Sequence, residues 1–373
     1  SAILRLAGAE WKSSVTRIAE VITLFTLPAA ASFPLIHLGR TGVFYYLMPY
    51  PNFRGIWPDF QSPLVWDFFA ISTYFSGSVV FLYVTMVPDF GICRPHMTGW
   101  RRYLYATLSW GWRGTAEEWK RVKEAASLFS VLILPVVISV HTIVSWDFAM
   151  QLVPAFHSEV FGPYFFVGAL FSGVAAVETM MCLLKWNVKE YRDFLQPIHF
   201  DMMGRVWLIL SLAYSYLYLN DFLPKYYIHE PGKMNYYFYM YFQSGYAPLF
   251  WFMFFSNFVA PVFCLGFKPL RENEVLCFIL AFGVNIGMYI ERVVIILPGL
   301  AVWNNLARNV HNYIPSFGEI SVVAMTFAAV IAGLMLFCRV FPILPIWELH
   351  ETRARYLTRQ IAGETIGYFK SGE

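Results

Sequence analysis

The sequence predicts an all-α integral membrane protein, built in this chain as a bundle of eight transmembrane helices. Hydrophobic residues make up 58% of the 373 residues and only 14% are charged, whereas soluble domains carry roughly a quarter. Stretches of about 20 apolar residues recur, each long enough to cross a bilayer as a helix. Trp and Tyr gather near the ends of these stretches, as in an interfacial belt. A transmembrane β-barrel would instead show short alternating segments.

The apolar stretches predict spans at 15–38, 63–87, 125–148, 162–185, 203–223, 248–267, 275–299 and 318–342. Between them, three long aromatic connections fall on one side of the membrane, at 40–62, 151–162 and 224–247. On the other side, residues 101–124 mix aromatic and charged residues, which is typical of an interfacial amphipathic helix or helix pair. No composition shift marks a soluble domain, so residues 1–373 are expected to form one transmembrane domain.

The distribution of basic residues predicts the orientation of these spans. Of the 27 Lys and Arg residues, the side with the long aromatic loops holds only Arg40, Arg54, Lys225, Lys233 and Arg308, and Arg292 lies within a span. All the others lie on the opposite side or at its helix ends. Cytoplasmic loops carry an excess of Lys and Arg. The long aromatic loops are therefore expected outside, on the periplasmic side of a bacterial inner membrane.

Carboxylates and imidazoles cluster near the outer ends of three successive spans. His37 closes the first span, Asp67 lies just inside the second, and His141 and Asp147 lie in the outer part of the third. Ionisable groups in hydrocarbon are costly, so they are functional candidates. Carboxylate and imidazole groups accept protons, and aromatic side chains around them offer an apolar slot. The pattern predicts a pocket that binds a hydroquinone and takes its protons. The structural alternative for His37 is a histidine at a helix end beside Arg40.

Other ionisable groups in the spans are candidates for a proton path or for structural ion pairs. They are Glu20, Glu178, Asp201, Glu291 and Arg292, with His199 near Asp201. Glu178 and Glu20 are expected near the inner face, where Lys185 and Arg17 could pair with them. Adjacent residues on a helix do not face one another, so Arg292 is expected to pair with the outer acidic cluster rather than with Glu291.

The cysteines and histidines favour no bound metal, haem or iron–sulfur cluster in this chain. None of the five cysteines forms a CxxC pair, and four lie in or beside apolar spans. A bis-histidine haem needs paired mid-span histidines, and only His141 is well inside a span. Nothing in the sequence is typical of a nucleic-acid-binding protein.

Three segments resemble the NrfD / polysulfide-reductase family of membrane subunits. They are FPLIHLGRTGVFYYLMPYPN (33–52), WPDFQSPLVWDFFAISTYF (57–75) and VISVHTIVSWDFAMQLVPAFHSEVFGPYFFVGALFSG (137–173). Within the family they are most similar to the larger of the two quinol-binding integral subunits of alternative complex III. Such subunits have about ten helices. The resemblance therefore implies that SAILRL (1–6) is the end of an upstream helix and that this chain lacks the native N-terminal part.

The resemblance also implies a function and a site. His37, Asp67 and Asp147 fall on positions taken to act on quinol at the periplasmic face, with His141 and Arg40 as further quinol-binding residues. The site would come mainly from the helices at 15–38, 63–87 and 125–148. The chain would bind quinol, with menaquinol as the expected type, and hold no redox cofactor of its own. Its expected partners are an iron–sulfur subunit, c-type haem subunits, a second NrfD-like membrane subunit and lipids. Proton translocation is a further expectation for the family.

Two functions from other classes of membrane protein are alternatives. A secondary transporter or proton channel could also carry intramembrane acids, although it would favour mid-depth acids and an inverted repeat with broken helices. A membrane anchor without a site is the other alternative, and the outer cluster argues against it.

The charge asymmetry makes a direct prediction about orientation. In a chain without its native cysteines, a cysteine in the 40–62 loop should react with an impermeant thiol reagent from the periplasm, and one near Lys120 only from the cytoplasm. The reverse labelling pattern would move the proposed pocket to the inner face.

Overall fold

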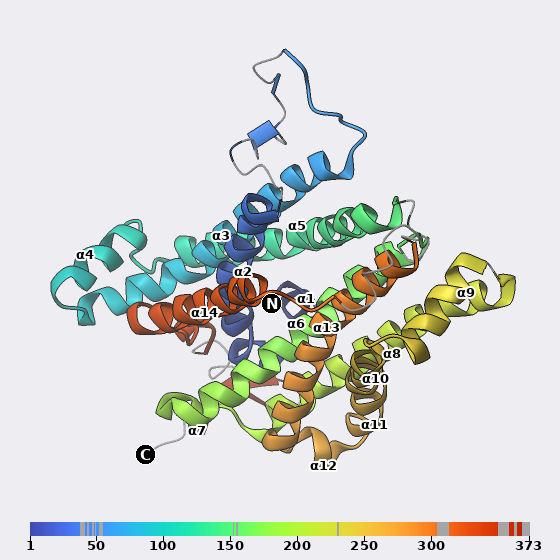
Figure 1. Cartoon of the computed structure of the whole chain (residues 1–373). Helices are drawn as coiled ribbons and strands as arrows, with labels where there is room; N and C mark the ends of the chain where they lie inside the picture. The colour runs from blue at the N-terminus through green and yellow to red at the C-terminus, as the bar shows by residue number, and fades with distance from the viewer. Residues whose placement is uncertain are drawn as a thin grey trace. The chain divides into compact units, whose positions relative to one another are not determined.

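The computed structural model describes residues 1–37, 42, 45–46, 48, 50–51, 55–151, 153, 156–229, 231–303, 313–349, 358–361 and 364–367. The α-helices (Figure 1) are α1 Ala2–Leu6, α2 Thr16–His37, α3 Pro63–Cys93, α4 Gly99–Leu108, α5 Ala116–Ala149, α6 Phe161–Asn187, α7 Lys189–Phe194, α8 Pro197–Ile228, α9 Pro231–Phe238, α10 Ala247–Phe254, α11 Ala260–Cys264, α12 Lys268–Arg271, α13 Glu274–Trp303 and α14 Phe317–Val340. The 3-10 helices are Glu10–Ser14 and Arg94–His96, and π-helical turns cover Tyr239–Gln243 and Phe255–Val259. A two-stranded antiparallel hairpin consists of β1 Thr358–Ile361 and β2 Glu364–Gly367.

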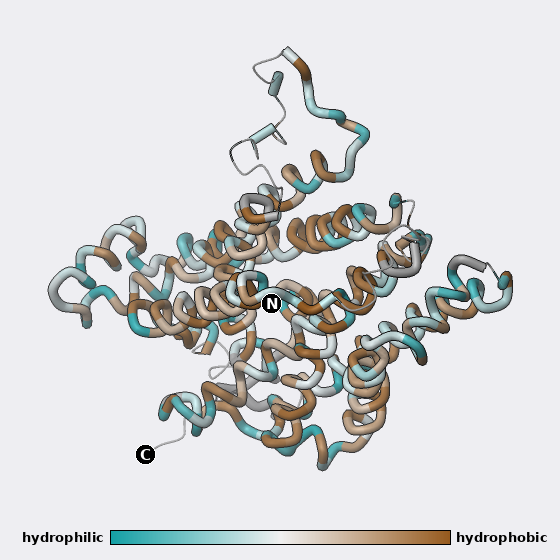
Figure 2. The backbone as a smooth tube through the Cα atoms, in the orientation of Figure 1, coloured by the Kyte–Doolittle hydropathy of each residue, from teal (hydrophilic) through white to brown (hydrophobic). Residues whose placement is uncertain are grey.

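The predicted helical membrane class is confirmed. Among the described residues, seven helical segments are long and apolar enough to cross a membrane, and the hydropathy along the backbone shows them as brown stretches (Figure 2). These segments are Pro63–His96, Ala116–Ala149, Phe161–Asn187, Pro197–Ile228, Ala247–Cys264, Glu274–Leu300 and Phe317–Val340. They match the second to eighth predicted spans. The predicted first span is the 22-residue helix α2, which is not among the seven.

Local sequence signals explain where several helices begin. Pro63 and Pro197 stand at the first positions of α3 and α8, where the missing proline N–H costs nothing. The N-terminus of α8 is closed by a capping box, in which the backbone N–H of Gln196 donates to Nδ1 of His199 at 3.0 Å. His199, a polar group noted at the inner end of the fifth predicted span, is therefore used as a helix cap.

The chain divides into two compact units, which are described separately. The first comprises residues 1–30, 75–135 and 326–373. Aromatic contacts hold it together, such as the edge-to-face pair Phe25–Phe337 with ring centroids 6.3 Å apart. The hydroxyl of Tyr105 in α4 donates to the carbonyl of Val340 at the end of α14 (2.8 Å). Gly333 permits close contact between α14 and α2, because a Cβ there would lie 2.3 Å from the ring of Phe25.

The second unit comprises residues 31–74 and 136–325. Its core is formed where α6, α8 and α13 pack together around fully buried aromatic side chains. Tyr214 stacks on Phe171 and Phe258, each with ring centroids 5.2 Å apart. Close backbone approach matters here too, since a Cβ on Gly168 would lie 3.0 Å from the Tyr214 ring. This packing fixes the rotation of α6 and α13, and so decides which polar side chains meet.

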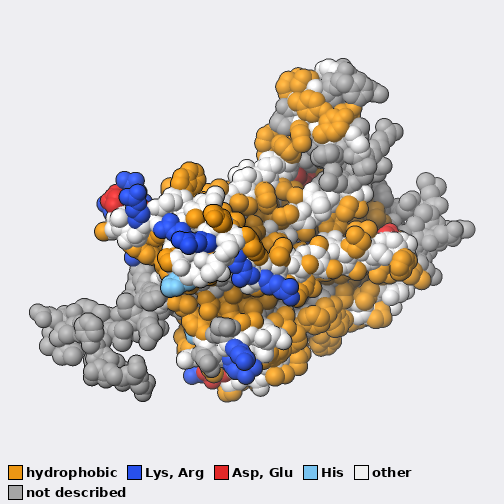
Figure 3. All heavy atoms as spheres, turned by 90° about the vertical axis from the view of Figure 1, so that its left-hand side faces the viewer, with side chains coloured by type: hydrophobic (Ala, Val, Ile, Leu, Met, Phe, Trp, Pro, Cys, Tyr) orange, Lys and Arg blue, Asp and Glu red, His pale blue; other side chains and the backbone are white. Residues whose placement is uncertain are grey.

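The predicted 101–124 segment is a pair of helices rather than one. The short helix α4 ends at Leu108, and α5 begins at Ala116 after a turn in which Trp110 has a positive φ of 44°. Trp112 folds back to pack edge-to-face on Trp119, with centroids 5.0 Å apart. Figure 3 looks at the side of the molecule where α4 lies in Figure 1, and shows Lys and Arg side chains among hydrophobic ones.

The contact between Gly91 and Trp112 makes a stability prediction. A Cβ at Gly91 would lie 2.1 Å from Cδ1 of Trp112, whereas a Cβ at Gly77 on the same helix would lie 3.6 Å from Ile133. Overpacking lowers the free energy of unfolding by about 1–3 kcal/mol. Replacing Gly by Ala within a helix otherwise raises it by roughly 0.5–1 kcal/mol. Gly91→Ala should therefore lower the midpoint of thermal unfolding in detergent by a few degrees, and the control Gly77→Ala should leave it unchanged or raise it. Equal midpoints for the two variants would contradict this packing.

Candidate functional site

Two carboxyl groups from different helices meet in the second unit. Asp67 lies in the second turn of α3, and Asp147 lies near the end of α5. Their carboxyl groups are close enough to interact with each other, and the neighbouring indoles of Trp66 and Trp146 pack edge-to-face with centroids 5.9 Å apart. Both carboxyl groups are half-buried. Positions 80 residues apart in the chain therefore form one acidic pair, defined here as the Asp67–Asp147 pair.

The chemistry of this pair follows from the closeness of its two carboxyl groups. A carboxylate only accepts hydrogen bonds, so two carboxyl groups can be joined by one only if one of them is protonated. Two carboxyls sharing a proton carry a single negative charge and can take up one more proton. In addition, Oδ1 of Asp67 is buried and has no hydrogen-bond partner among the described residues. That oxygen is available to accept a hydrogen bond from a ligand hydroxyl.

Of the other residues predicted for the outer cluster, the structure describes the side chain of His141 but not those of His37 and Arg40. His141 lies two turns before Asp147 on α5, is half-buried, and is close enough to the Arg292 guanidinium to interact with its charge. His37 is the last residue of α2, but its side chain is outside the described part of the chain, as is all of Arg40. The structure thus brings Asp67 and Asp147 together and places His141 toward Arg292.

Arg292 corrects one expectation from the sequence. Its Nη2 lies 3.8 Å from Oε2 of the adjacent Glu291, and its guanidinium stacks 3.8 Å from the centroid of the Phe165 ring. The predicted pairing with the outer acidic cluster is wrong for the contacts that the structure describes. The long side chain of arginine can fold back along the helix surface, so neighbours whose Cα–Cβ bonds diverge can still meet.

Glu291 is buried between α6, α8 and α13. The hydroxyls of Tyr164 and Tyr214 both donate to its Oε1, the second at 2.5 Å, and these hydroxyls lie 2.8 Å from each other. The two phenol rings are stacked with centroids 4.8 Å apart. Only 2% of Glu291 is exposed. Neither tyrosine was singled out from the sequence, because nothing in a local pattern shows that two tyrosines on different helices share one carboxylate.

Glu178 lies farther along α6 and is fully buried. The Cys277 thiol faces it, but that thiol donates to the carbonyl of Arg271 at 3.1 Å. Neither Glu178 oxygen has a hydrogen-bond partner in the described part of the chain. The ion pair considered for it is not formed, because Lys185 pairs with Glu274 at 2.5 Å. From Tyr164, which contacts Glu291, to Glu178 is about 21 Å along α6 at 1.5 Å per residue.

Polar side chains occupy part of the interval between Glu291 and Glu178. Asn285 on α13 donates to Oγ1 of Thr179 at 3.4 Å. Asn257, on the π-helical turn Phe255–Val259, is fully buried and lies 3.4 Å from the sulfur of Met288. π-Helical turns often occur at functional sites. Asn285 and Thr179 belong to the α6–α13 contact that carries the two glutamates, and Asn257 adds a polar group against α13.

Asp201 is held as an ion pair. It is fully buried, and its two oxygens accept hydrogen bonds from Nη2 of Arg205 and Nε of Arg271, both at 2.7 Å. Arg271 also donates to the carbonyl of Leu265 at 2.6 Å, and Gly204 leaves room for its side chain. A carboxylate held by two guanidinium groups is poorly suited to exchange protons. The geometry therefore favours a structural ion pair for Asp201 over a place in a proton path.

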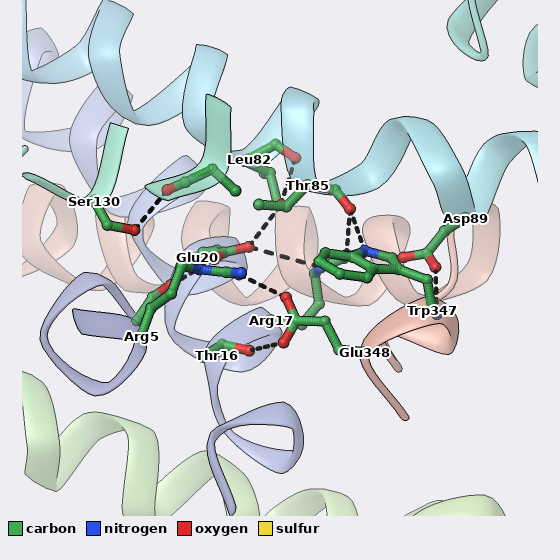
Figure 4. Close-up of polar contacts among 12 residues, drawn as sticks. Arg5, Thr16, Arg17, Glu20, Leu82, Thr85, Asp89, Ser130, Trp347 and Glu348 are labelled. Atoms are coloured by element: carbon green, nitrogen blue, oxygen red, sulfur yellow. Dashed lines mark hydrogen bonds and ion pairs between the residues drawn. The ribbon is translucent and has the colours of Figure 1, made fainter. Parts of the chain in front are cut away.

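Glu20 belongs to a cluster of buried charges in the first unit (Figure 4). Its Oε2 lies 3.7 Å from Nε of Arg17 and accepts a hydrogen bond from Thr85. Arg17 is the partner expected from the sequence, and it also donates to Asp89 at 2.8 Å. Glu348 completes the cluster, because it accepts hydrogen bonds from Arg5 and Thr16.

Three members of this buried cluster were not predicted from the sequence. Asp89 lies two residues beyond the second predicted span, where a charge is unremarkable, and it is held by Arg17 and by the backbone N–H of Trp347 at 3.1 Å. Arg5 and Glu348 are more than 300 positions apart in the chain, yet they are paired at 2.5 Å. No local pattern could have joined them.

The described residues contain no group of three or more His, Cys, Asp or Glu side chains that could hold a metal ion. All five cysteines are free.

Comparison with known proteins gives one family. The model of the family described as "Polysulphide reductase, NrfD" matches residues 1–304. This range contains the Asp67–Asp147 pair, Glu178 and Glu291. No curated protein matches the chain. Because the family match covers well over half of the 373 residues, this chain belongs to the polysulphide reductase, NrfD family.

Proposed function

We propose that this chain is a quinol-binding and quinol-oxidising integral membrane subunit of a multi-subunit electron-transfer complex. The observation that carries the proposal is the Asp67–Asp147 pair. Keeping two carboxyl groups in contact inside a membrane helix bundle is costly, and the pair offers both a proton acceptor and an unfilled hydrogen-bond acceptor on Asp67. Membership of the NrfD family supports the same function.

The reaction assigns a role to each group. Oxidation of one quinol to quinone releases two electrons and two protons. The Asp67–Asp147 pair carries one negative charge and takes one proton from a quinol hydroxyl. An imidazole takes the other, and His37 and His141 are the two candidates. Arg40 is proposed to bind the quinol near the membrane surface. Protons taken up near the outer face can then leave to the periplasm.

The electrons need a partner, because this chain is proposed to hold no redox cofactor. We assign them to an adjoining iron–sulfur subunit and then to c-type haem subunits, as in alternative complex III. In that arrangement the chain corresponds to ActC, the larger quinol-binding integral subunit, beside a second NrfD-like subunit and lipids in a bacterial inner membrane. Menaquinol is the proposed substrate. The resemblance of residues 33–52, 57–75 and 137–173 to this branch supports the assignment.

A proton path is proposed through the second unit. Four residues were candidates: Glu20, Glu178, Asp201 and Glu291. The ion pairs of Glu20 and Asp201 favour structural roles for these two. Glu178 has no salt bridge among the described residues and Glu291 has only Arg292 at 3.8 Å, and both lie along the α6–α13 contact to which Asn285 and Thr179 also belong. Glu178 is proposed as the inner member of this path.

A proton channel or secondary transporter remains the alternative function. The buried Glu178, which has no salt bridge among the described residues, is the observation that favours it. The two functions differ in one respect, since a channel or transporter would work without electron transfer. Dependence of proton movement on quinol oxidation therefore discriminates between them.

Asp67→Asn should lower quinol turnover of the purified complex by about tenfold or more. Asparagine keeps the size of the side chain but accepts no proton, and loss of a proton acceptor typically costs roughly 10²–10⁴-fold in rate. The assay is steady-state oxidation of a short-chain quinol, with subunit content checked on the same sample.

Asp59→Asn is the matched control, because Asp59 is exposed and its carboxylate caps only the local turn at Gln61. This control should turn over quinol at the normal rate. Full activity in the Asp67→Asn complex would show that the pair is not the quinol site.

Glu178→Gln should reduce proton uptake from the cytoplasm while leaving quinol binding intact. Glutamine fills the same space but cannot carry a proton. Proton-to-electron ratios are measured with a pH dye in vesicles that contain the reconstituted complex, beside the control Glu124→Gln, whose side chain is 65% exposed. An unchanged ratio in Glu178→Gln would leave only proton release at the outer site.

A further inference from the structure

The turn between α3 and α5 is rich in arginine, and the acids that follow it, Glu117 and Glu118, stand in the first turn of α5. From residue 90 to residue 116 the sequence contains four arginines, Arg94, Arg101, Arg102 and Arg113, and no Asp or Glu. Arg101, Arg102 and Arg113 are exposed. Within the described part of the chain, none of these three has a carboxylate within salt-bridge distance. The start of α5 differs, because there Arg121 pairs with Glu117 at 3.1 Å and Lys120 with Glu124 at 4.0 Å.

A second basic element lies beside α4. The guanidinium of Arg101 donates through Nη2 to the carbonyl of Arg339 at 3.0 Å. Arg339 lies in the last turn of α14, and its side chain is exposed. The end of α14 therefore adds a cation to the arginines of α4, and the hydroxyl contact of Tyr105 with Val340 fixes the two elements together.

Three large aromatic side chains project from the same short segment. Trp100 is 61% exposed, Tyr103 78% and Trp110 83%. Trp110 is held in a left-handed backbone conformation with φ 44°, which is uncommon for a bulky residue. Its neighbours explain how it is held: the N–H of Ser109 donates to Tyr105, and the buried Trp112 packs on Trp119. The turn thus directs the indole of Trp110 outward while Trp112 packs inside the chain.

The connections of α4 keep this segment near the membrane. The span Pro63–His96 ends three residues before α4 begins, and the span Ala116–Ala149 begins within eight residues of its end. So few residues cannot carry α4 far from the bilayer. Trp and Tyr are enriched where membrane and water meet, and arginine recognises phosphate through paired N–H groups.

We propose that α4, the Trp110 turn and the end of α14 bind the phosphate groups of anionic phospholipids, with Arg101, Arg102, Arg113 and Arg339 as ligands and Trp100, Tyr103 and Trp110 inserted at headgroup level. This surface is named the arginine–aromatic surface. It faces the leaflet on the arginine-rich side, which the charge asymmetry predicts to be cytoplasmic. Charge complementarity favours anionic over zwitterionic lipid, because each Lys or Arg near the surface adds attraction to an anionic leaflet.

The experiment measures lipid binding to the full chain by native mass spectrometry from detergent micelles. Palmitoyl-oleoyl phosphatidylglycerol and palmitoyl-oleoyl phosphatidylcholine are the two probes. The unaltered chain should bind phosphatidylglycerol about tenfold or more tightly than phosphatidylcholine. The triple variant Arg101→Gln, Arg102→Gln, Arg113→Gln should lose most of this preference. Equal binding of the two lipids by the unaltered chain would overturn the proposal.

A matched triple variant separates this surface from general charge. Lys120→Gln, Arg121→Gln, Lys123→Gln removes the same charge from the exposed start of α5, and it should keep the preference. An equal loss in both variants would show non-specific attraction and would also overturn the proposal.

A second measurement does not depend on the arginine variants. A spin label on Trp110→Cys, in a chain without its native cysteines and reconstituted in phosphatidylglycerol nanodiscs, should be more accessible to oxygen than to a water-soluble nickel complex. The opposite accessibility would place the turn in water and contradict the insertion.

Discussion

The cost of an uncompensated charge in a membrane interior governs how the polar residues of this chain are arranged. A charged side chain at the centre of a bilayer costs about 2.5–3.5 kcal/mol on insertion scales. Most buried charges that the structure describes are therefore neutralised within the chain. Asp201 is held by two arginines, and Arg17 joins Asp89 and Glu20. These pairs also fix the packing, since removing one partner of a buried pair would leave the other charge uncompensated.

Three carboxyl sites do not follow this solution, and all lie in the second unit. Asp67 and Asp147 interact with each other, Glu291 receives two tyrosine hydroxyls with Arg292 only at 3.8 Å, and Glu178 has no hydrogen-bond partner among the described residues. A carboxyl group without a close guanidinium can change its protonation state at a smaller electrostatic penalty. The proposed function uses these carboxyl groups and assigns structural roles to Glu20 and Asp201.

Two basic segments at the surface of the protein also differ in how their charge is balanced. Basic residues at the start of α5 have acidic neighbours on their own helix, so their charge is balanced locally. The side chains of Arg101, Arg102 and Arg113 form no salt bridge in the described part of the chain, where Glu118 contacts only the backbone N–H of Arg113, and they lie among exposed aromatic rings. An unbalanced cationic surface beside two membrane spans attracts negative charge from outside the chain. Phospholipid headgroups supply that charge at the same depth.

The sequence by itself determined the helical membrane class and the order of the spans along the chain, because span length and hydropathy are local properties of the chain. It also identified Arg17 as a partner for Glu20, three residues away. Only the tertiary structure decided that Lys185 pairs with Glu274, that Arg292 folds back toward Glu291, that Tyr164 and Tyr214 share one carboxylate, and that Arg5 meets Glu348. Hydropathy sets how deep a residue lies, whereas the rotation of each helix about its axis depends on the packing of residues distant in the chain, and that rotation selects the partners.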